Sequence, residues 1–314
     1  MSCDRRGFAL LAVLWVLVGV SAVSVAALLV ARGAVSAAGN RVALARAQWQ
    51  AEDCLERARA VIDDAVGGGN DLPRPVDGGW AELDRVVVAS PAVSDAACDI
   101  GLRPTGMAVD VNRATVEQLR ALLLAAGASE AQGDSMTDAL LDWRDADDIA
   151  RPFGAERDWY LVAHRQPPRN GAFADVRELR DVRGFGADVM PDSVLTMLFT
   201  VEPGRVVWDR APLVVLASLP GMTDEALGRV AELRARGQSV PSIETLNAGL
   251  SLTAAEALSA RYGDLAQMTT GEPDAWVLVA RGHAGGPPAV AASVEVLLVH
   301  AGRRVAIVRR RTTP

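Results

Sequence analysis

The sequence is poor in the residues that build metal, haem and nucleophilic sites. It has three cysteines and three histidines in 314 residues, no C-x-x-C pair and no Gly-rich phosphate loop. The histidines stand far apart, and no serine has a histidine near it in the sequence to activate it. A zinc or haem-attachment site therefore finds no support, and an enzyme is the least supported class of protein.

Lysine is absent altogether. All 32 basic residues are arginines, against 39 acidic residues, and the formal net charge is −7. No block of like charge is long enough to form a nucleic-acid-binding tail, so a phosphate backbone is not expected as the main partner. Half of the residues are hydrophobic, which excludes a disordered chain, and the length allows one long domain or two modest ones.

Charge is also missing from a long stretch near the N-terminus. Residues Phe8 to Ala31 form an uncharged run that a helix would extend over about 36 Å, enough to cross a bilayer. Arg5 and Arg6 precede it, which predicts a cytoplasmic N-terminal end and export of the rest of the chain. Unlike a secretory signal, the run passes into a further helical stretch that ends near Ile62. We therefore expect one helix of about fifty residues, half in lipid and half in water.

The water-exposed half of this predicted helix has an imperfect apolar stripe. Its members are spaced as on one side of a helix: Val42, Ala45, Trp49 and Leu55. Gly33, Gly39 and Asn40 are expected to weaken the helix locally without stopping it.

The junction Arg5-Arg6-Gly7-Phe8 resembles the processing site of type IV pilin-like proteins. The resemblance implies that a prepilin peptidase cuts after Gly7 and methylates the new N-terminal Phe8. The alternative is a signal anchor that is never cut. Most members of that family carry Glu at the fifth mature position, where this chain has Ala12. A carboxylate in a bilayer is costly unless it is paired, so an apolar residue there suits a subunit with no neighbour stacked beyond it.

Short β-branched runs stand at both ends of the exported part. A Gly/Pro/Asp-rich loop is predicted at Gly67–Gly79. Three runs are predicted as strands: Arg85–Ala89, Ala97–Gly101 and Trp276–Ala280. A hairpin is predicted where two further runs flank Ala301-Gly302, namely Val294–His300 and Arg303–Arg309. Strands at both ends with helices between them predict one small sheet interrupted by an insertion.

The insertion, roughly Met107 to Met268, contains short helices and an imperfect internal repeat. Val111–Leu122 aligns with Trp208–Leu219 at an offset of 97 residues, and an Asn or Asp near the start of each is predicted to cap the helix that follows. Each unit is followed by a short element that ends in Leu: Phe173–Leu179 and Val240–Leu246. The simplest interpretation is two related helical units docked on each other.

Four segments of the insertion resemble, in the same order, motifs of the K-type minor pseudopilins of type II secretion systems. They are Val109–Ala114, Asp142–Asp147, Gly154–Tyr160 and Phe173–Gly184. The second half departs from the family pattern, because Trp208-Asp-Arg replaces a second N-x-N. K-type members also characteristically lack the Glu at the fifth mature position.

This resemblance implies an α+β fold, in which a small pseudopilin β-sheet domain follows a long N-terminal transmembrane helix and is interrupted by a large α-helical insert. The implied boundaries are a prepilin leader at 1–7, the helix at 8–66 with its transmembrane part at 8–31, the sheet domain at 67–106 and 269–314, and the insert at 107–268.

The resemblance also implies a structural role. The chain would be a single-pass protein of the bacterial inner membrane with its C-terminal domain in the periplasm. It would join the I- and J-type minor pseudopilins in a tip complex that starts pseudopilus assembly and aids protein export across the outer membrane. Prepilin peptidase, the inner-membrane platform and membrane lipid are further implied partners, and no nucleic acid is expected. Trp15, Trp49 and the apolar residues of the helix would form the contact surface.

A different function is suggested by Leu219-Pro-Gly-Met222, which resembles the hairpin of helix-hairpin-helix DNA-binding modules. It would make the chain a membrane-anchored DNA receptor of the competence type. Asp224 and Glu225 argue against this, because phosphate binding requires Lys or Arg. The flanking Arg229, Arg234 and Arg236 keep the alternative open.

Two side-chain groups have open assignments. The acidic residues Asp142, Asp145, Asp147 and Asp148 form either a site for a hard cation such as Ca²⁺, which the family is known to bind, or a solvated helix end. Cys54 and Cys98, which remain if the leader with Cys3 is removed, form either one disulfide or two buried free thiols.

Overall fold

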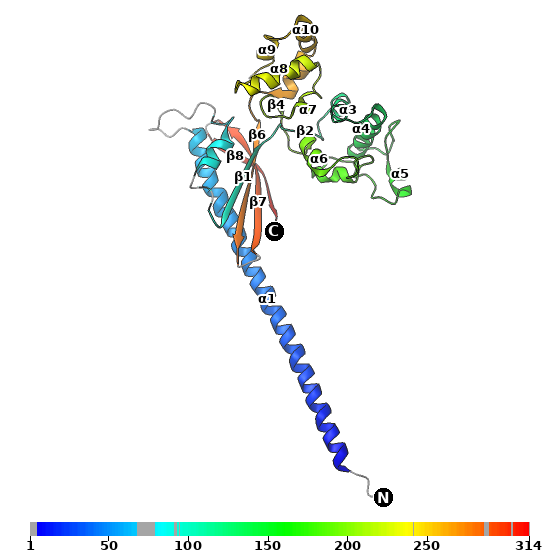
Figure 1. Cartoon of the computed structure of the whole chain (residues 1–314), viewed down its shortest axis with the longest axis vertical. Coiled ribbons are helices and arrows are strands. Elements are labelled where there is room, and N and C mark those ends of the chain that lie inside the picture. The colour runs from blue at the N-terminus through cyan, green and yellow to red at the C-terminus, as the bar shows by residue number, and fades with distance from the viewer. Residues whose placement is uncertain are drawn as a thin grey trace.

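A computed structural model describes residues 5–67, 79–90, 93, 95–240, 242–285, 289–302 and 304–313. Figure 1 shows a long N-terminal helix, a sheet packed on the C-terminal part of that helix, and a group of short helices at the end farthest from the N-terminus. The predicted α+β fold class is confirmed. Residues 1–4 of the predicted leader and most of the predicted loop at Gly67–Gly79 lie outside the described residues.

Helix α1 (Arg5–Gly67) is continuous through Gly33, Gly39 and Asn40, so the predicted single helix is confirmed and is longer than expected. Every residue from Leu11 to Val42 is exposed. Its most apolar 18-residue window has a mean hydropathy of 2.6 and nothing in the chain covers it, so the helix has the length and composition to cross a membrane.

The C-terminal part of α1 packs one face on the sheet. Its fully buried residues repeat every three or four positions: Ala47, Ala51, Cys54, Ala58 and Ile62. Strand β6 (Ala275–Ala284) crosses the helix so closely that a Cβ built at Gly282 would overlap the carbonyl oxygen of Ala47. Glycine at this position is therefore required for the helix and sheet to meet.

The sheet has the strand order β1-β6-β7-β8, with every neighbouring pair antiparallel. Its other strands are β1 (Cys98–Pro104), β7 (Val290–Ala301) and β8 (Arg304–Thr313). The predicted C-terminal hairpin is β7–β8, and the predicted strands at Ala97–Gly101 and Trp276–Ala280 lie within β1 and β6. Pro104 pairs with Trp276, so the insert leaves and re-enters the sheet on adjacent strands.

The predicted strand at Arg85–Ala89 is wrong, because Leu83–Ala89 forms helix α2. Leu83 and Val87 are buried, while Arg85 between them is exposed. A strand would place Arg85 on the same face as its buried neighbours, whereas a helix turns it away. Packing against α1 thus overrides the β propensity of the Val86-Val87-Val88 run.

The insert consists of two units, and each is closed by a short parallel ladder. In unit 1, β2 (Val109–Asp110) pairs with β3 (Phe199–Thr200), and in unit 2, β4 (Val206–Val207) pairs with β5 (Thr269–Thr270). Val109 and Val206 differ by 97 positions, the offset of the sequence repeat. Unit 1 contains α3 (Val116–Ala125), α4 (Glu130–Arg144), α5 (Arg157–Val162), the 3₁₀ helix η1 (Val176–Arg180) and α6 (Asp192–Leu198). Unit 2 contains α7 (Leu213–Leu216), α8 (Asp224–Ala235), α9 (Ile243–Asn247), α10 (Leu252–Ala260) and α11 (Tyr262–Met268).

The prediction that the polar residue near the start of each repeat caps the following helix is wrong. Thr115 caps α3, where its hydroxyl accepts a hydrogen bond from the backbone of Gln118 at 3.2 Å. Asn112 instead exchanges two hydrogen bonds with the backbone of Phe173, donating from Nδ2 at 3.0 Å and accepting at Oδ1 at 2.7 Å. The residue therefore joins two distant segments of unit 1.

Unit 2 uses the equivalent residue in the same way. Asp209 Oδ1 accepts a hydrogen bond from the backbone N–H of Val240 at 2.8 Å. Phe173 and Val240 are the first residues of the two Leu-ending elements, whose last residues, Leu179 and Leu246, are fully buried. The internal repeat is thus a repeat of contacts as well as of sequence.

A half-buried arginine near the end of a helix strengthens this equivalence. Arg144 at the end of α4 donates to the carbonyl oxygens of Val111 and of Ala114, the latter at 2.7 Å. Arg234 near the end of α8 donates to the carbonyl oxygen of Trp208, with an Nε–O distance of 3.0 Å. Val111 and Trp208 are again 97 residues apart.

Candidate functional site

The N-terminal third of α1 is a surface without a partner in the described chain. Gly7 and Phe8 lie in its first turns, and Ala12, the fifth residue after Gly7, is exposed. Trp15 is 70% exposed and is surrounded along the helix by other exposed apolar residues. An apolar helix of this length requires lipid or other apolar helices around it.

The two tryptophans of α1 cannot share one contact face. A helix turns about 100° per residue, which places Trp15 and Trp49 about 160° apart around a straight axis. Trp49 is 76% exposed and lies on the side of α1 opposite the sheet. The predicted contact surface therefore divides into two faces at two heights along the helix.

A disulfide joins α1 to the first strand of the sheet. Cys54 and Cys98 are both buried, with their Cα atoms 5.9 Å apart and their positions 44 apart in the sequence. The backbone carbonyl oxygen of Val93 lies 3.2 Å from Cys98 Sγ. Of the two open assignments for these cysteines, the structure has the disulfide, which fastens the helix to the sheet at the centre of their shared core.

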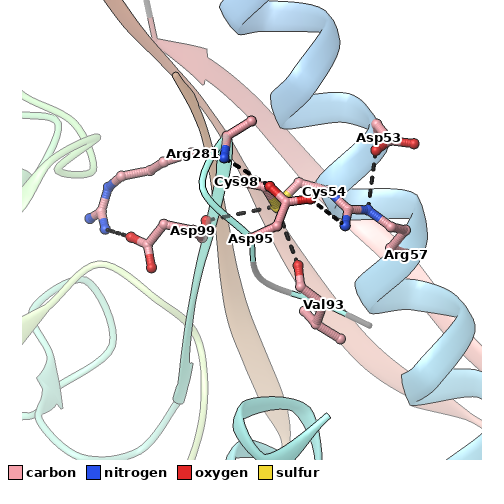
Figure 2. The surroundings of a disulfide bond; sticks show 9 residues. Asp53, Cys54, Arg57, Val93, Asp95, Cys98, Asp99 and Arg281 are labelled. Carbon is pink, nitrogen blue, oxygen red and sulfur yellow. Dashed lines mark hydrogen bonds and ion pairs between the residues drawn. A yellow bond between two sulfur atoms is a disulfide. The ribbon is translucent and has the colours of Figure 1, made fainter. Parts of the chain in front are cut away.

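Charged pairs surround this disulfide on its exposed side, as Figure 2 shows. Arg57 on α1 lies 3.1 Å from Asp53 and donates to Asp95 at 3.0 Å. Arg281 of β6 donates across the sheet to its β1 partner Asp99 at 3.1 Å. These exposed pairs add little stability individually. Of the three, the Arg57–Asp95 pair joins α1 to the segment just before β1, as the disulfide joins α1 to β1.

The acidic segment at the end of α4 is divided between a buried part and an exposed part. The Asp142 side chain is fully buried, and it accepts hydrogen bonds from the backbone N–H of Arg151 at 3.2 and 3.3 Å. A Cβ built at Gly154 would overlap the Asp142 carboxylate, so glycine is needed there. Burial raises the pKa of Asp142. Asp147 and Asp148, by contrast, are exposed.

Glu156 is a further carboxylate close to Asp142 and Asp145, and it is 6% exposed. We refer to these three side chains as the acidic pocket. Neither of its oxygens meets a hydrogen-bond donor in the described part of the chain. Burial first, and then repulsion from Asp142, Asp145 and Asp148, raises the pKa of Glu156 to about 7. One oxygen of Asp145 is likewise buried without a partner, and burial raises the pKa of Asp145. Glu156 lies in the segment Gly154–Tyr160 that resembles a family motif, but the sequence does not reveal that its side chain is buried.

These residues fit a hard cation in chemistry, although they do not form a closed cage. The oxygens of Glu156 and Asp145 that lack a hydrogen-bond partner are carboxylate oxygens, the ligands that Ca²⁺ prefers. Within the described residues, no group of three His, Cys, Asp or Glu side chains is already arranged to hold a metal ion. Arg151 provides one positive charge, with its guanidinium 3.5 Å from Asp142 and 3.8 Å from Asp145. Three acidic side chains around one arginine leave the pocket with excess negative charge.

The hairpin at Leu219–Met222 is used for packing. Gly221 has φ +78°, and a Cβ added to it would lie 2.6 Å from the carbonyl oxygen of Ala257. Arg229 and Arg236 pair with Glu232, and Arg234 is directed to the backbone of Trp208. Arginines held in internal contacts cannot provide a phosphate-binding surface, so the DNA-receptor alternative is not favoured.

The exposed apolar part of α1 has the length and composition of a membrane anchor, and the other half of the helix is fixed to a small antiparallel sheet. Residues 100–194, from β1 to α6, match the family model of the type II secretion system (T2SS), protein K. A comparison with curated proteins gave no match. Over these residues, which make up less than a third of the chain, the chain is similar to protein K of type II secretion systems.

A solved structure has the same fold. It is a chain of the GspK-GspI-GspJ complex from the type 2 secretion system of enterotoxigenic Escherichia coli, with a TM-score of 0.64 and 16% sequence identity. The match covers 90% of this chain and 99% of that chain. At this low identity the likeness shows that the architecture is shared, including the large helical insert.

Proposed function

We propose that this chain is the tip subunit of a type II secretion pseudopilus, where it assembles with I- and J-type minor pseudopilins and has a structural rather than a catalytic role. The observation that carries the proposal is the bare apolar surface of α1 from Leu11 to Ala31, continuous with a helix that is fixed to a folded head. The chain of the same fold comes from a complex with GspI and GspJ, which supports such partners.

The tip position is supported by the residue at the fifth mature position. Ala12 is exposed and apolar, so it needs no charged partner inside the bilayer. A subunit with a Glu there would need the free amine of a neighbouring subunit. A subunit without one can start the assembly.

The proposed location is the bacterial inner membrane, with the sheet and insert in the periplasm. Arg5 and Arg6 precede the apolar run, which favours a cytoplasmic N-terminal end. The buried disulfide between Cys54 and Cys98 suits an oxidising compartment such as the periplasm.

Processing by a prepilin peptidase would free Phe8 as the mature N-terminus. The test replaces Gly7 by Leu in the full chain, in cells that hold the complete secretion system. We expect an uncut precursor and loss of secretion, because the peptidase must accommodate the residue before the cut. The matched control is Gly33→Leu, since a side chain added there meets nothing within 4 Å in the described structure. Normal maturation and export of the Gly7→Leu chain would contradict the proposal.

A second role is favoured by the unpaired Glu156. We infer that Asp142, Asp145 and Glu156 hold a hard cation such as Ca²⁺, which would neutralise their mutual repulsion and fix the loop between α4 and α5. Asp147 and Asp148 lie on the adjacent exposed loop, and their part in binding stays a prediction.

A further inference from the structure

A cavity of about 650 Å³ lies where the two units of the insert join the sheet. Its walls come from the start of unit 1, from the linker between the units and from the sheet. The sheet provides an apolar wall, to which Leu297, Val299 and Val308 belong. A cavity of this size, largely apolar and with a few polar groups, is typical of sites for small organic ligands. We refer to it as the junction cavity.

Two polar side chains of unit 1 line the junction cavity although both are more than nine-tenths buried. Asp110 in β2 is 9% exposed, and Gln118 in α3 is 7% exposed. Among the described residues, the Asp110 carboxylate accepts one hydrogen bond, from the backbone N–H of Asn112 at 2.9 Å, and the side-chain amide of Gln118 has no partner. Buried polar groups are normally paired. Burial raises the pKa of Asp110 in spite of the opposing charges of Arg113 and Arg144, so these arginines do not replace a direct partner.

The internal repeat shows that the fold itself does not require these two polar groups. Asp110 corresponds to Val207 at the offset of 97, and each is the second residue of its short parallel strand. Gln118 corresponds to Val215, and each is the third residue of its helix, α3 or α7. Both valines are buried. The same framework thus buries valine in unit 2 at the positions where unit 1 presents an acid and an amide to a cavity.

A positive charge lines the same cavity. Arg113 is exposed, and its guanidinium forms no hydrogen bond or ion pair within the described part of the chain. Its counterpart in unit 2, Arg210, instead pairs with Asp84 at 2.8 Å. The other two charged residues that line the cavity neutralise each other, since Arg205 lies 2.6 Å from Asp274. The described walls therefore offer a carboxylate and a guanidinium that lack an ion-pair partner, and an unpaired amide.

We propose that the junction cavity binds a small zwitterion, namely an α-amino acid or a short peptide with an apolar side chain. The ammonium group would donate to the Asp110 carboxylate and to the amide oxygen of Gln118. The carboxylate would accept from the guanidinium of Arg113, whose fork of donors matches it. The apolar side chain would pack against Leu297 and Val299 of the sheet. A ligand with a single charge would leave either the acid or the arginine without a partner.

This site shares no residue with the acidic pocket or with α1, so the inference is independent of the proposed function. Its ligand would touch unit 1 and the sheet at once. Binding would therefore hold the insert against the sheet and stabilise the folded chain.

The test measures binding to the full chain in neutral detergent micelles by isothermal titration calorimetry. The probes are L-leucine and the dipeptide leucyl-leucine, which are zwitterions, and leucinol and isocaproic acid, which each keep one of the two charged groups. We expect a zwitterion to bind at one site per chain, and both single-charge analogues to bind at least tenfold more weakly. The tighter of the two zwitterions identifies the source as a free amino acid or a peptide. No binding of either zwitterion, or equal binding of a single-charge analogue, would overturn the proposal.

Variants that copy unit 2 connect the binding to the named residues. Asp110→Val and Gln118→Val should each weaken zwitterion binding at least tenfold, and unit 2 shows that the framework accepts valine there. Arg113→Gln should weaken the zwitterions equally but leave the weak binding of leucinol unchanged, because leucinol has no carboxylate. Glu178→Gln, a control in unit 1 outside the cavity, should bind like the native chain.

A second substitution at the same position separates loss of binding from loss of folding. Asp110→Asn removes the charge but keeps the size of the side chain and an oxygen for the N–H of Asn112. It should weaken binding as Asp110→Val does, while hydrogen exchange of unit 1 without ligand stays that of the native chain. Native binding in Asp110→Asn, or weakened binding in Glu178→Gln, would overturn the proposal.

Discussion

The two units of the insert have the same framework and differ in one loop. Each has an Asn or Asp that binds a Leu-ending element, and each has a half-buried arginine that donates to a backbone carbonyl near the start of the repeat. In unit 1, residues 145–172 lie between α4, which ends with Arg144, and the Leu-ending element. In unit 2, only residues 236–239 lie between α8 and the Leu-ending element. The acidic pocket is built largely on this extra segment. The comparison indicates that the charged site depends on a loop that unit 1 has and unit 2 lacks.

Replacing the two half-buried arginines, Arg144 and Arg234, tests the shared framework with the largest expected effect. Arg144→Met leaves two carbonyl oxygens without a donor and removes one of the positive charges near the buried Asp110, so unit 1 should lose about 3 kcal/mol. Arg234→Met leaves one carbonyl oxygen, so unit 2 should lose about 2 kcal/mol. Hydrogen exchange of the full chain in detergent micelles measures each unit separately. If either substitution lowered the stability of both units equally, the two units would not be independent and the comparison between them would fail.

The acidic pocket predicts that pH acts on unit 1 alone. The pKa of Glu156 is raised in the folded chain to about 7, so its protonated form is favoured by folding. Stability is therefore fully present below the unfolded pKa and falls as pH rises through about 7, by about 2 kcal/mol without a divalent cation. Burial raises the pKa of Asp142 and Asp145 as well, which adds in the same direction.

Calcium should reverse this loss, and Glu156→Gln should remove the part of the pH dependence near pH 7 and abolish the calcium response. The measurement is hydrogen exchange in unit 1 at pH 5 and pH 8, with and without added Ca²⁺. Glu178→Gln is a control in the same unit, because that carboxylate pairs with Arg169 away from the pocket. A calcium response that survives in Glu156→Gln would show that the pocket is not the site.

The smallest effect is expected at the polar residues that start each repeat. Asn112→Ala removes two hydrogen bonds to the buried Phe173, whereas Asp209→Ala removes one to Val240 and one to the exposed Ser239. Each should destabilise its own unit by about 1–2 kcal/mol, and Asn112→Ala should cost more. Local hydrogen exchange of the two Leu-ending elements is the readout. A helix-capping role would instead loosen α3 or α7 and leave those elements unchanged.

The elements that could be predicted from sequence are those whose cause is local. The apolar run of α1 needs no partner within the chain to show its length, and Ala301-Gly302 indicates a tight turn between two β-branched runs. The repeat was visible because equivalent contacts preserve equivalent residue types 97 positions apart.

The features that could not be predicted depend on distant residues. The Val-rich run at Arg85–Ala89 became α2 because α1 packs on it, and no local pattern shows that. Asn112 was predicted to cap a helix, whereas its partner Phe173 is 61 residues away. Glu156 was visible as part of a motif, but its burial beside Asp142 follows only from how the loop folds back on α4.

The most direct test of the account is the identity of the first residue of the protein extracted from membranes. Mass spectrometry of the N-terminal peptide should find N-methylated Phe8, because a cut after Gly7 would release a pilin-like helix whose apolar surface starts at its first residue. A protein that retains Met1, or one whose head is found in the cytosol, would contradict the account.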